Sequence, residues 1–429
     1  MTSSEINIPA DVAETLVDPA AFADGRIFDS YAWLRANRPL AVAQPQGFDP
    51  FWVVTRHADI LEISRQNELF HSGDRPTTIV GREGEAKVRQ MTGGSPHLVR
   101  SLVQMDAPDH PKYRALTQAW FMPPSIRKLE DSIREIARAS VQRMAETGGQ
   151  CDFVTEVALH YPLHVIMEIL GVPAADEPRM LMLTQELFGA TDPDLGSTPA
   201  KAPTNGDEGM AVMQGIIADF YQYFTAISTD RRATPTGDLA TVIANGQIDG
   251  APISELEAMS YYMIVATAGH DTTSSTAATA LWALAENPDQ LAWLKQDLTR
   301  IPGLIDEAIR WATPVKTFMR SATADAEVGG QSIPKGDWLM LCYASGNRDE
   351  GVFEDAGAFR ADRTPNKQLA FGYGAHLCLG QHLAKMEMRI LFEELLPRLK
   401  SVKLAGAPRM SQAVFVNGLK SLPIAFEMV

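Results

Sequence analysis

A glycine-punctuated loop around one cysteine constrains the fold of this chain more than any other feature. It spans residues 371–380, with the sequence Phe-Gly-Tyr-Gly-Ala-His-Leu-Cys-Leu-Gly. Glycine adopts backbone conformations closed to other residues, so a flat ligand can approach the loop closely. A helix is predicted from about Leu379, and its positive N-terminal end favours the thiolate of Cys378. The loop therefore predicts a thiolate metal ligand, shielded by Phe371, although an isolated cysteine can also be a small buried hydrophobic residue.

A long helix is predicted over residues 254–286. Ser254 and Glu257 have the spacing of a capping box, and Asn287 followed by proline ends the pattern. The helix is then about 30 residues long, or roughly 45 Å.

The centre of this predicted helix is poor in helix-forming residues. Gly269 is followed by an almost wholly polar run at 271–276. The hydroxyl of Thr272 can bond the carbonyl four residues back, at Ala268, which loosens the helix and opens a groove. Taken alone, the pattern also fits a bent packing helix.

Two pairs of polar residues have helical spacing. His110 and Arg114 are four residues apart, so they share a helix face and can hold one anionic group together. Glu307 and Arg310 are three apart, a spacing usually found in solvated ion pairs worth roughly 0.3 to 0.5 kcal/mol. Neither pair is specific by itself.

Together these segments resemble the cytochrome P450 monooxygenases. The pattern Phe-Gly-x-Gly-x-His-x-Cys-x-Gly, followed by Leu383-Ala384 and Glu387, matches the haem-ligand signature of that family. The resemblance implies haem b (iron protoporphyrin IX) with Cys378 as its metal ligand, since a cysteine thiolate favours O–O cleavage. It also implies one cytochrome P450 domain over residues 1–429, mainly α with a small β region, with the haem between the long central helix and the helix after the cysteine loop.

The resemblance also implies roles for individual residues. Asp271 and Thr272 match the acid-alcohol pair that delivers protons during O2 activation. Glu307, Arg310 and Arg363 match a structural brace for the segment before the cysteine loop. The expected haem-binding residues are His110, Arg114, Ala268, Arg320, Phe371, His376, Cys378 and Gly380, of which His110, Arg114, Arg320 and His376 would contact the propionates.

A small neutral hydrophobic substrate is expected from the apolar residues near these motifs. The expected pocket residues are Leu98, Val99, Leu102, Val103, Ile264, Val265, Val315 and Phe318. Arg100 and Lys316 lie nearby, and both are expected to face solvent.

Residues 125–130, 161–165, 266–275 and 314–320 look close to a bacterial, alpha-terpineol-hydroxylating branch of the family. That likeness implies hydroxylation of a monoterpenoid such as terpineol, or of an alkylated aromatic such as p-cymene. A fatty acid, a steroid or a polycyclic aromatic is the alternative substrate. A peroxygenase of the same fold lacks the acid-alcohol pair, and a non-enzymatic haem protein would need an output domain for which no segment is spare.

The net charge of −15, from 53 acidic and 38 basic residues, argues against nucleic-acid binding. The resemblance implies O2 as co-substrate and electrons from a [2Fe-2S] ferredoxin, reduced by an NAD(P)H-dependent ferredoxin reductase. A docking patch for the ferredoxin is expected at Lys112, Arg114, Lys367, Lys385 and Arg389, although scattered basic residues are usually only a solvated face.

The N-terminal residues have neither the basic nor the apolar segment of a signal peptide, and no apolar run approaches the roughly 20 residues of a membrane span. We therefore expect a cytoplasmic enzyme without a membrane partner, with Cys151 and Cys342 as reduced thiols. Residues 73–94 and 192–209 are polar and rich in glycine, proline and serine, so both are predicted to be loops. In the family such loops are lids over the substrate.

Overall fold

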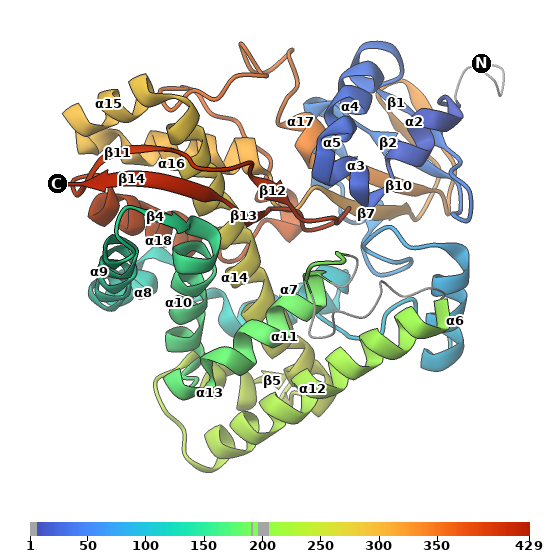
Figure 1. The fold of residues 1–429 in the computed structure, drawn as a ribbon. Coiled ribbons are helices and arrows are strands. Elements are labelled where there is room, and N and C mark those ends of the chain that lie inside the picture. The colour runs from blue at the N-terminus through green and yellow to red at the C-terminus, as the bar shows by residue number, and fades with distance from the viewer. Residues whose placement is uncertain (1–6, 190–191, 196–205) are drawn as a thin grey trace.

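The computed structural model describes residues 7–189, 192–195 and 206–429. Its fold is mainly α with a small β region, as predicted. A β-rich part contains the N-terminal helices, and a larger helical part surrounds the long helix α14 (Figure 1). None of the helices in the described part of the chain is long and apolar enough to span a membrane.

The described α-helices are α2 (Ala10–Thr15), α3 (Pro19–Asp24), α4 (Arg26–Asn37), α5 (His57–Arg65), α6 (Arg82–Thr92), α7 (Asp109–Gln118), α8 (Pro123–Ile126), α9 (Glu130–Glu146), α10 (His160–Leu170), α11 (Glu177–Gly189), α12 (Gly206–Ala233), α13 (Leu239–Ala244), α14 (Glu255–Glu286), α15 (Pro288–Gln296), α16 (Ile301–Ala312), α17 (Tyr343–Gly346) and α18 (Gln381–Leu395).

The described strands are β1 (Leu40–Ala43), β2 (Phe51–Val54), β3 (Phe70–His71), β4 (Gln150–Asp152), β5 (Gln247–Ile248), β6 (Ala251–Pro252), β7 (Thr317–Ala322), β8 (Ala326–Val328), β9 (Gln331–Ile333), β10 (Trp338–Cys342), β11 (Leu399–Leu404), β12 (Arg409–Met410), β13 (Leu419–Ser421) and β14 (Pro423–Met428).

The largest sheet joins strands from both ends of the chain in the order β1-β2-β10-β7-β3. β10 pairs in parallel with β2, with Leu339 opposite Trp52, and antiparallel with β7. Successive side chains of a strand point to opposite faces of a sheet. Accordingly Met340 packs into one apolar cluster with α2–α4, whereas Leu339 and Leu341 pack into another with α5. Both faces of this sheet are therefore covered.

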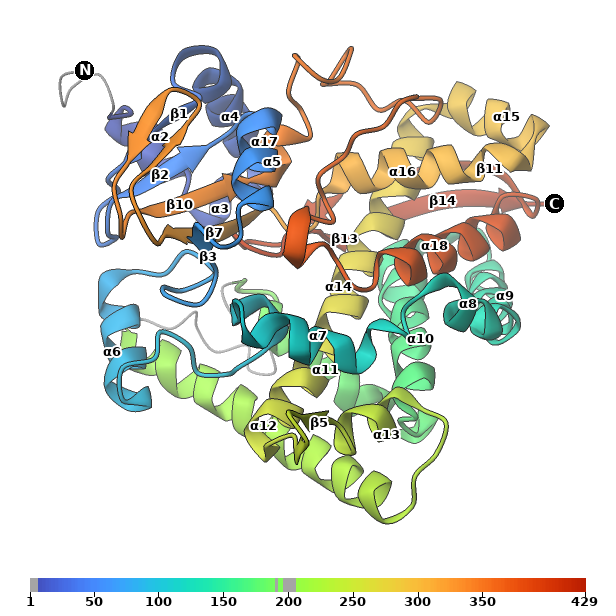
Figure 2. The same cartoon turned by 180° about the vertical axis from the view of Figure 1, so that it is seen from behind.

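α14 forms the centre of the helical part and packs against α10, α11, α12, α16 and α18. Figure 2 shows α7, α14 and α18 around the middle of the molecule. The predicted capping box is present: Ser254 Oγ accepts a hydrogen bond from the Glu257 amide, and the Glu257 carboxylate accepts one from the Ser254 amide, both at 3.3 Å. The helix ends at Glu286, as its sequence predicts.

One of the two predicted loops contains a helix. Residues 82–92 form α6. An ion pair between Glu85 and Arg89, at 2.8 Å, joins successive turns of this helix, and Gly93 caps its C-terminus in the left-handed conformation. The prediction was wrong here because residues 82–92, which contain one glycine and no proline or serine, were grouped with the glycine-, proline- and serine-containing residues around them. Of the second predicted loop, residues 192–195 are described, α12 begins at Gly206, and the intervening residues lie outside the described part.

Candidate active site

The cysteine loop is held in place by its own backbone and by α5. The Cys378 amide donates to the carbonyl of Phe371 at 2.8 Å. Gly374 has φ of +71°, and a Cβ atom at this position would lie 2.0 Å from the Ser64 carbonyl oxygen of α5. Only glycine satisfies both conditions. α18 begins at Gln381, two residues later than predicted, because Gly380 is its N-cap.

Two opposing effects act on the Cys378 thiol. Burial raises its pKa, whereas the amides of Gly380 and Gln381 and the charge of Arg114 act to lower it. The helix N-terminus therefore acts in the predicted direction, but burial outweighs it. A metal cation at the sulfur would supply the counter-charge that stabilises the thiolate.

Cys378 lines a cavity of about 550 Å³. The same cavity is lined by every other residue that was predicted to bind the haem: His110, Arg114, Ala268, Arg320, Phe371, His376 and Gly380. It is also lined by every predicted pocket residue: Leu98, Val99, Leu102, Val103, Ile264, Val265, Val315 and Phe318. The tertiary structure therefore brings together residues that are up to 282 positions apart in the sequence, from Leu98 to Gly380.

Two arginines at this cavity have no acidic partner in the described part of the chain. Arg114 donates to the carbonyl of Leu377 at 2.8 Å, and Arg320 donates to the carbonyl of the preceding residue at 2.7 Å. The His110 ring lies 4.3 Å from the His376 ring. Burial lowers the pKa of His110 to about 4, and the nearby charges of His376 and Arg114 act in the same direction. The two guanidinium groups thus offer a site for an anionic group.

Ser72 and Asp106 lie beside the His376 ring, and sequence reasoning singled out neither of them. The Nε2 atom of His376 lies 3.2 Å from Ser72 Oγ and 3.9 Å from Asp106 Oδ1. Asp106 also accepts hydrogen bonds from the amides of Ser72 and Gly73. Burial opposes its ionisation, but these hydrogen bonds outweigh that effect and lower its pKa to about 2.

Asp271 and Thr272 face different cavities. The Thr272 hydroxyl donates to the Ala268 carbonyl at 2.6 Å, as predicted, and Thr272 lines the cavity of Cys378. Asp271 instead lines a second cavity of about 70 Å³. Adjacent residues point about 100° apart around a helix axis, which accounts for the separation. Burial raises the pKa of Asp271 to about 8, and its Oδ2 atom has no hydrogen-bond partner among the described residues.

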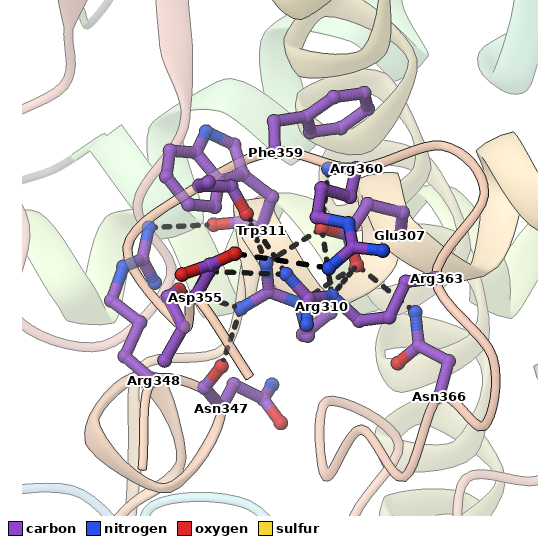
Figure 3. Close-up of polar contacts among 12 residues, drawn as sticks. Glu307, Arg310, Trp311, Asn347, Arg348, Asp355, Phe359, Arg360, Arg363 and Asn366 are labelled. Carbon is purple, nitrogen blue, oxygen red and sulfur yellow. Dashed lines mark hydrogen bonds and ion pairs between the residues drawn. The ribbon is translucent and has the colours of Figure 1, made fainter. Parts of the chain in front are cut away.

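Glu307 and Arg310 form a buried ion pair and not a solvated one. Both side chains are 0% exposed, and their closest oxygen and nitrogen lie 2.6 Å apart. Arg363 reaches the same carboxylate at 3.1 Å, and Arg310 donates to the Asn347 carbonyl at 2.7 Å (Figure 3). The Asn347 side chain in turn accepts from the Leu369 amide at 2.6 Å, directly before the cysteine loop.

The expectation that Lys316 faces solvent is wrong. The side chain is buried, and its Nζ atom donates to the Ala312 carbonyl at the end of α16, at 2.6 Å. Burial lowers the pKa of Lys316 to about 7. Arg100 is partly exposed and pairs with Asp109 and Glu257, which ties the segment before α7 to the first turn of α14.

The predicted basic docking patch has a mixed charge. Arg114 lies half-buried at the cavity, and Lys367 is exposed. The other predicted members form ion pairs, namely Lys112–Asp249, Lys385–Asp306, Arg389–Glu130 and Arg389–Glu393. Most of the expected positive charge is therefore neutralised by neighbouring carboxylates.

Glu387 is a buried carboxyl group at the main cavity to which the sequence analysis gave no role. Its Oε1 atom lies 3.4 Å from the Thr273 hydroxyl, and its Oε2 atom has no hydrogen-bond partner within the part of the chain that the structure describes. Burial raises the pKa of this carboxyl group. A signal was available: Glu387 lies four residues from both Leu383 and Leu391, which belong to the apolar stripe of α18.

The chain is similar to known proteins over nearly its whole length. The family model described as Cytochrome P450 matches residues 75–411. Cytochrome P450-terp of Pseudomonas sp is 49% identical over 420 residues, which cover 98% of each chain. Linalool 8-monooxygenase of Pseudomonas putida is 32% identical over 397 residues, which cover 92% of this chain and 94% of the relative.

The fold is likewise similar to solved structures. The crystal structure of CYP108D1 from Novosphingobium aromaticivorans DSM12444 matches with a TM-score of 0.90 and 44% sequence identity, over 98% of this chain and 99% of the other. The similarity therefore includes the N-terminal β-rich part as well as the helical part.

Proposed function

Because the chain belongs to the cytochrome P450 family, a family of monooxygenases, we propose that it hydroxylates a monoterpenoid or an alkylated aromatic of similar size. One observation carries the proposal: a chain 49% identical to a protein named Cytochrome P450-terp encloses an apolar cavity beside Cys378.

Proteins of this family bind haem b through a cysteine thiolate, and the haem supplies the activation of O2 for C–H hydroxylation. The residues of the main cavity fit this cofactor. Cys378 offers the sulfur, and Arg114 and Arg320 offer positive charge without an acidic partner in the described part of the chain. We assign the propionates of haem to these two arginines, with His110 and His376 beside them.

In the proposed reaction, side chains of α14 supply the protons. We assign Thr272 as the hydroxyl that holds a proton beside O2, since it lines the main cavity and is anchored to the Ala268 carbonyl. Asp271 is assigned as the acid that feeds this hydroxyl, because its raised pKa of about 8 keeps it protonated at neutral pH. Glu307, Arg310 and Arg363 hold the segment before the cysteine loop.

The substrate pocket favours a small neutral compound. Ile264, Val265, Val315 and Phe318 face the cavity with apolar side chains. The cavity of about 550 Å³ would hold both the haem and the substrate, and the similarity to Cytochrome P450-terp favours a ten-carbon ring compound over a steroid. A steroid, a fatty acid or a polycyclic aromatic is the alternative.

Electrons are proposed to come from a [2Fe-2S] ferredoxin, reduced by an NAD(P)H-dependent reductase in the cytoplasm. Lys367 is the exposed, basic candidate for contact, because Lys385 and Arg389 already pair with carboxylates. Changing Lys367 to Glu is expected to raise the ferredoxin concentration needed for half-maximal turnover. Lys403, which is exposed on β11, serves as the control, and an equal effect of the charge reversal at both positions would contradict a specific docking site.

The first experiment is an optical titration of the ferric protein with terpineol, p-cymene, a fatty acid and a steroid, followed by product analysis with ferredoxin, reductase and NADH. We expect a high-spin shift and a hydroxylated product only with the two small compounds. A response to the steroid or fatty acid alone would contradict the proposed substrate class. Product formation with hydrogen peroxide but not with the ferredoxin system would indicate a peroxygenase.

The Phe318→Ala variant tests the pocket itself. Phe318 lines the cavity, so loss of its ring is expected to weaken p-cymene binding about tenfold or more, from the apolar contact removed. Phe392 is fully buried in α18 but does not line the cavity, so Phe392→Ala destabilises the fold without a comparable change in substrate affinity. Equal affinities in Phe318→Ala and the wild type would contradict the pocket assignment.

A further inference from the structure

The cavity lined by Asp271 lies on a different face of α14 from the main cavity. Its volume of about 70 Å³ is enough for roughly two water molecules. Besides Asp271, its polar lining includes Ser274, Ser275, Ser411 and Lys420. A small space lined by several hydroxyl groups and a carboxyl group is a site where ordered water is expected.

Lys420 connects this cavity to the surface. Its Nζ atom lies 2.8 and 2.9 Å from the two carboxylate oxygens of Asp192, whose side chain is 0% exposed. The same nitrogen lies 2.9 Å from Asp194, whose side chain is 52% exposed. Lys420 thus lines the cavity and also takes part in a buried ion pair with Asp192 and in a contact with the partly exposed Asp194.

The chain around Lys420 packs directly on α14. A Cβ atom at Gly418 would lie 2.3 Å from the Ser275 hydroxyl, so only glycine permits this approach. Val416, two residues earlier, lines both the small cavity and the main one. The two cavities are therefore close neighbours, and Asp271 is adjacent in sequence to Thr272 on the main cavity.

We propose that the small cavity is a hydrated proton path, in which Lys420 and Asp192 are positioning residues that hold the water that reprotonates Asp271. The proposal rests on the proposed monooxygenase function. That reaction consumes the substrate C–H compound, O2, two electrons from the ferredoxin and two protons, and it yields the alcohol and one water. Each proton that leaves the Asp271 carboxyl group toward Thr272 is replaced from cavity water, which is replenished from solvent past Asp194.

A purely structural role for the Lys420–Asp192 pair is the competing explanation. In that case the pair would only tie residues 192–195 to β13, and its loss would lower stability without changing access of protons to Asp271. The two explanations differ in the rate at which the Asp271 carboxyl proton exchanges with solvent in the resting protein. This rate can be measured without substrate or turnover.

The experiment follows the infrared C=O band of protonated Asp271 after transfer of the haem-loaded protein into D2O. The band is assigned by its disappearance in Asp271→Asn. Exchange is expected to slow at least fivefold in Lys420→Met, and in Ser274→Val, which fills the cavity without touching the ion pair. Lys420→Arg is expected to restore the rate, and Lys400→Met, which removes a surface ion pair with Glu427, is expected to leave it unchanged.

Turnover provides a second readout. In Lys420→Met the kcat is expected to fall about fivefold with a larger solvent isotope effect, while the dissociation constant from the optical titration stays unchanged. Wild-type exchange and a wild-type isotope effect in folded Lys420→Met and Ser274→Val would overturn the proposal. If no substrate is hydroxylated but the exchange rate still depends on Lys420, the proposed function fails while the hydrated path stands.

Discussion

Replacing Glu307 with glutamine tests how much the buried brace stabilises the fold. The carboxylate accepts hydrogen bonds from the side chains of Arg310, Arg363 and Asn366 and from the Arg360 amide. Glu307→Gln keeps the shape but removes the one carboxylate that, among the described residues, pairs with the two buried guanidinium groups, and it directs an NH2 group at other donors. Breaking a buried ion pair from one side costs about 3–5 kcal/mol. We therefore expect a loss of about 3–5 kcal/mol in the free energy of unfolding.

The assay is urea unfolding followed by far-UV circular dichroism, with the midpoint shift converted by the measured m value. Glu354→Gln is the matched control, because the Glu354 side chain is 86% exposed and lies 3.6 Å from Arg360. An exposed pair of this kind contributes at most about 1 kcal/mol. The reasoning is refuted if Glu307→Gln loses no more stability than Glu354→Gln. Haem retention, measured in parallel, should fall with Glu307→Gln because the brace reaches the cysteine loop through Asn347.

Three further outcomes are expected. Thr272→Ala should lower the product formed per NADH several-fold and release peroxide, whereas Thr272→Ser should not; full coupling in the alanine variant would exclude a proton-delivery role. Burial raises the pKa of Asp271 to about 8, so between about pH 4 and pH 8 the folded state binds one proton more than the unfolded state. The free energy of unfolding therefore falls as pH rises through this window, by at most about 1.4 kcal/mol per pH unit. Asp271→Asn should remove that slope in urea titrations, and an unchanged slope would refute the assignment. Gly374→Ala should lower the free energy of unfolding by more than about 1 kcal/mol, since φ is +71° and the new Cβ would lie 2.0 Å from the Ser64 carbonyl oxygen. In the same assay Gly357→Ala should be nearly neutral, because a Cβ at Gly357 would have no described atom within 4 Å.

Several local patterns were read correctly because one stretch of backbone determines the contact, although the helix α6 was missed. The capping box at Ser254 and Glu257 and the hydrogen bond from Thr272 to Ala268 both depend on spacings of three or four residues within one helix. Helical geometry fixes such distances whatever surrounds the helix. The glycines of the cysteine loop were identified for a similar reason, because positive φ at Gly374 is a local property.

Long-range packing caused the misreadings of Lys316 and of the basic docking patch. Lys316 directly precedes the strand β7, and its local sequence gives no sign of burial. In the structure its ammonium group is buried and donates a hydrogen bond to the Ala312 carbonyl at the end of α16. Lys385 and Arg389 were taken as free positive charge, but Asp306 and Glu130 come from other helices to pair with them. The local sequence around a basic residue does not show which carboxylate, from a distant part of the chain, forms an ion pair with it.

The sequence by itself determined the thiolate loop, the long polar-centred helix and, through them, the family. These depend on motifs in which each residue acts on near neighbours. Only the tertiary structure decided that Arg114 and Arg320 meet at one cavity, that Glu387 is buried there, and that Asp271 faces a separate space beside Lys420. Helical periodicity fixes the angle of about 100° between Asp271 and Thr272, but which segments fill those two directions depends on packing between residues far apart in the chain.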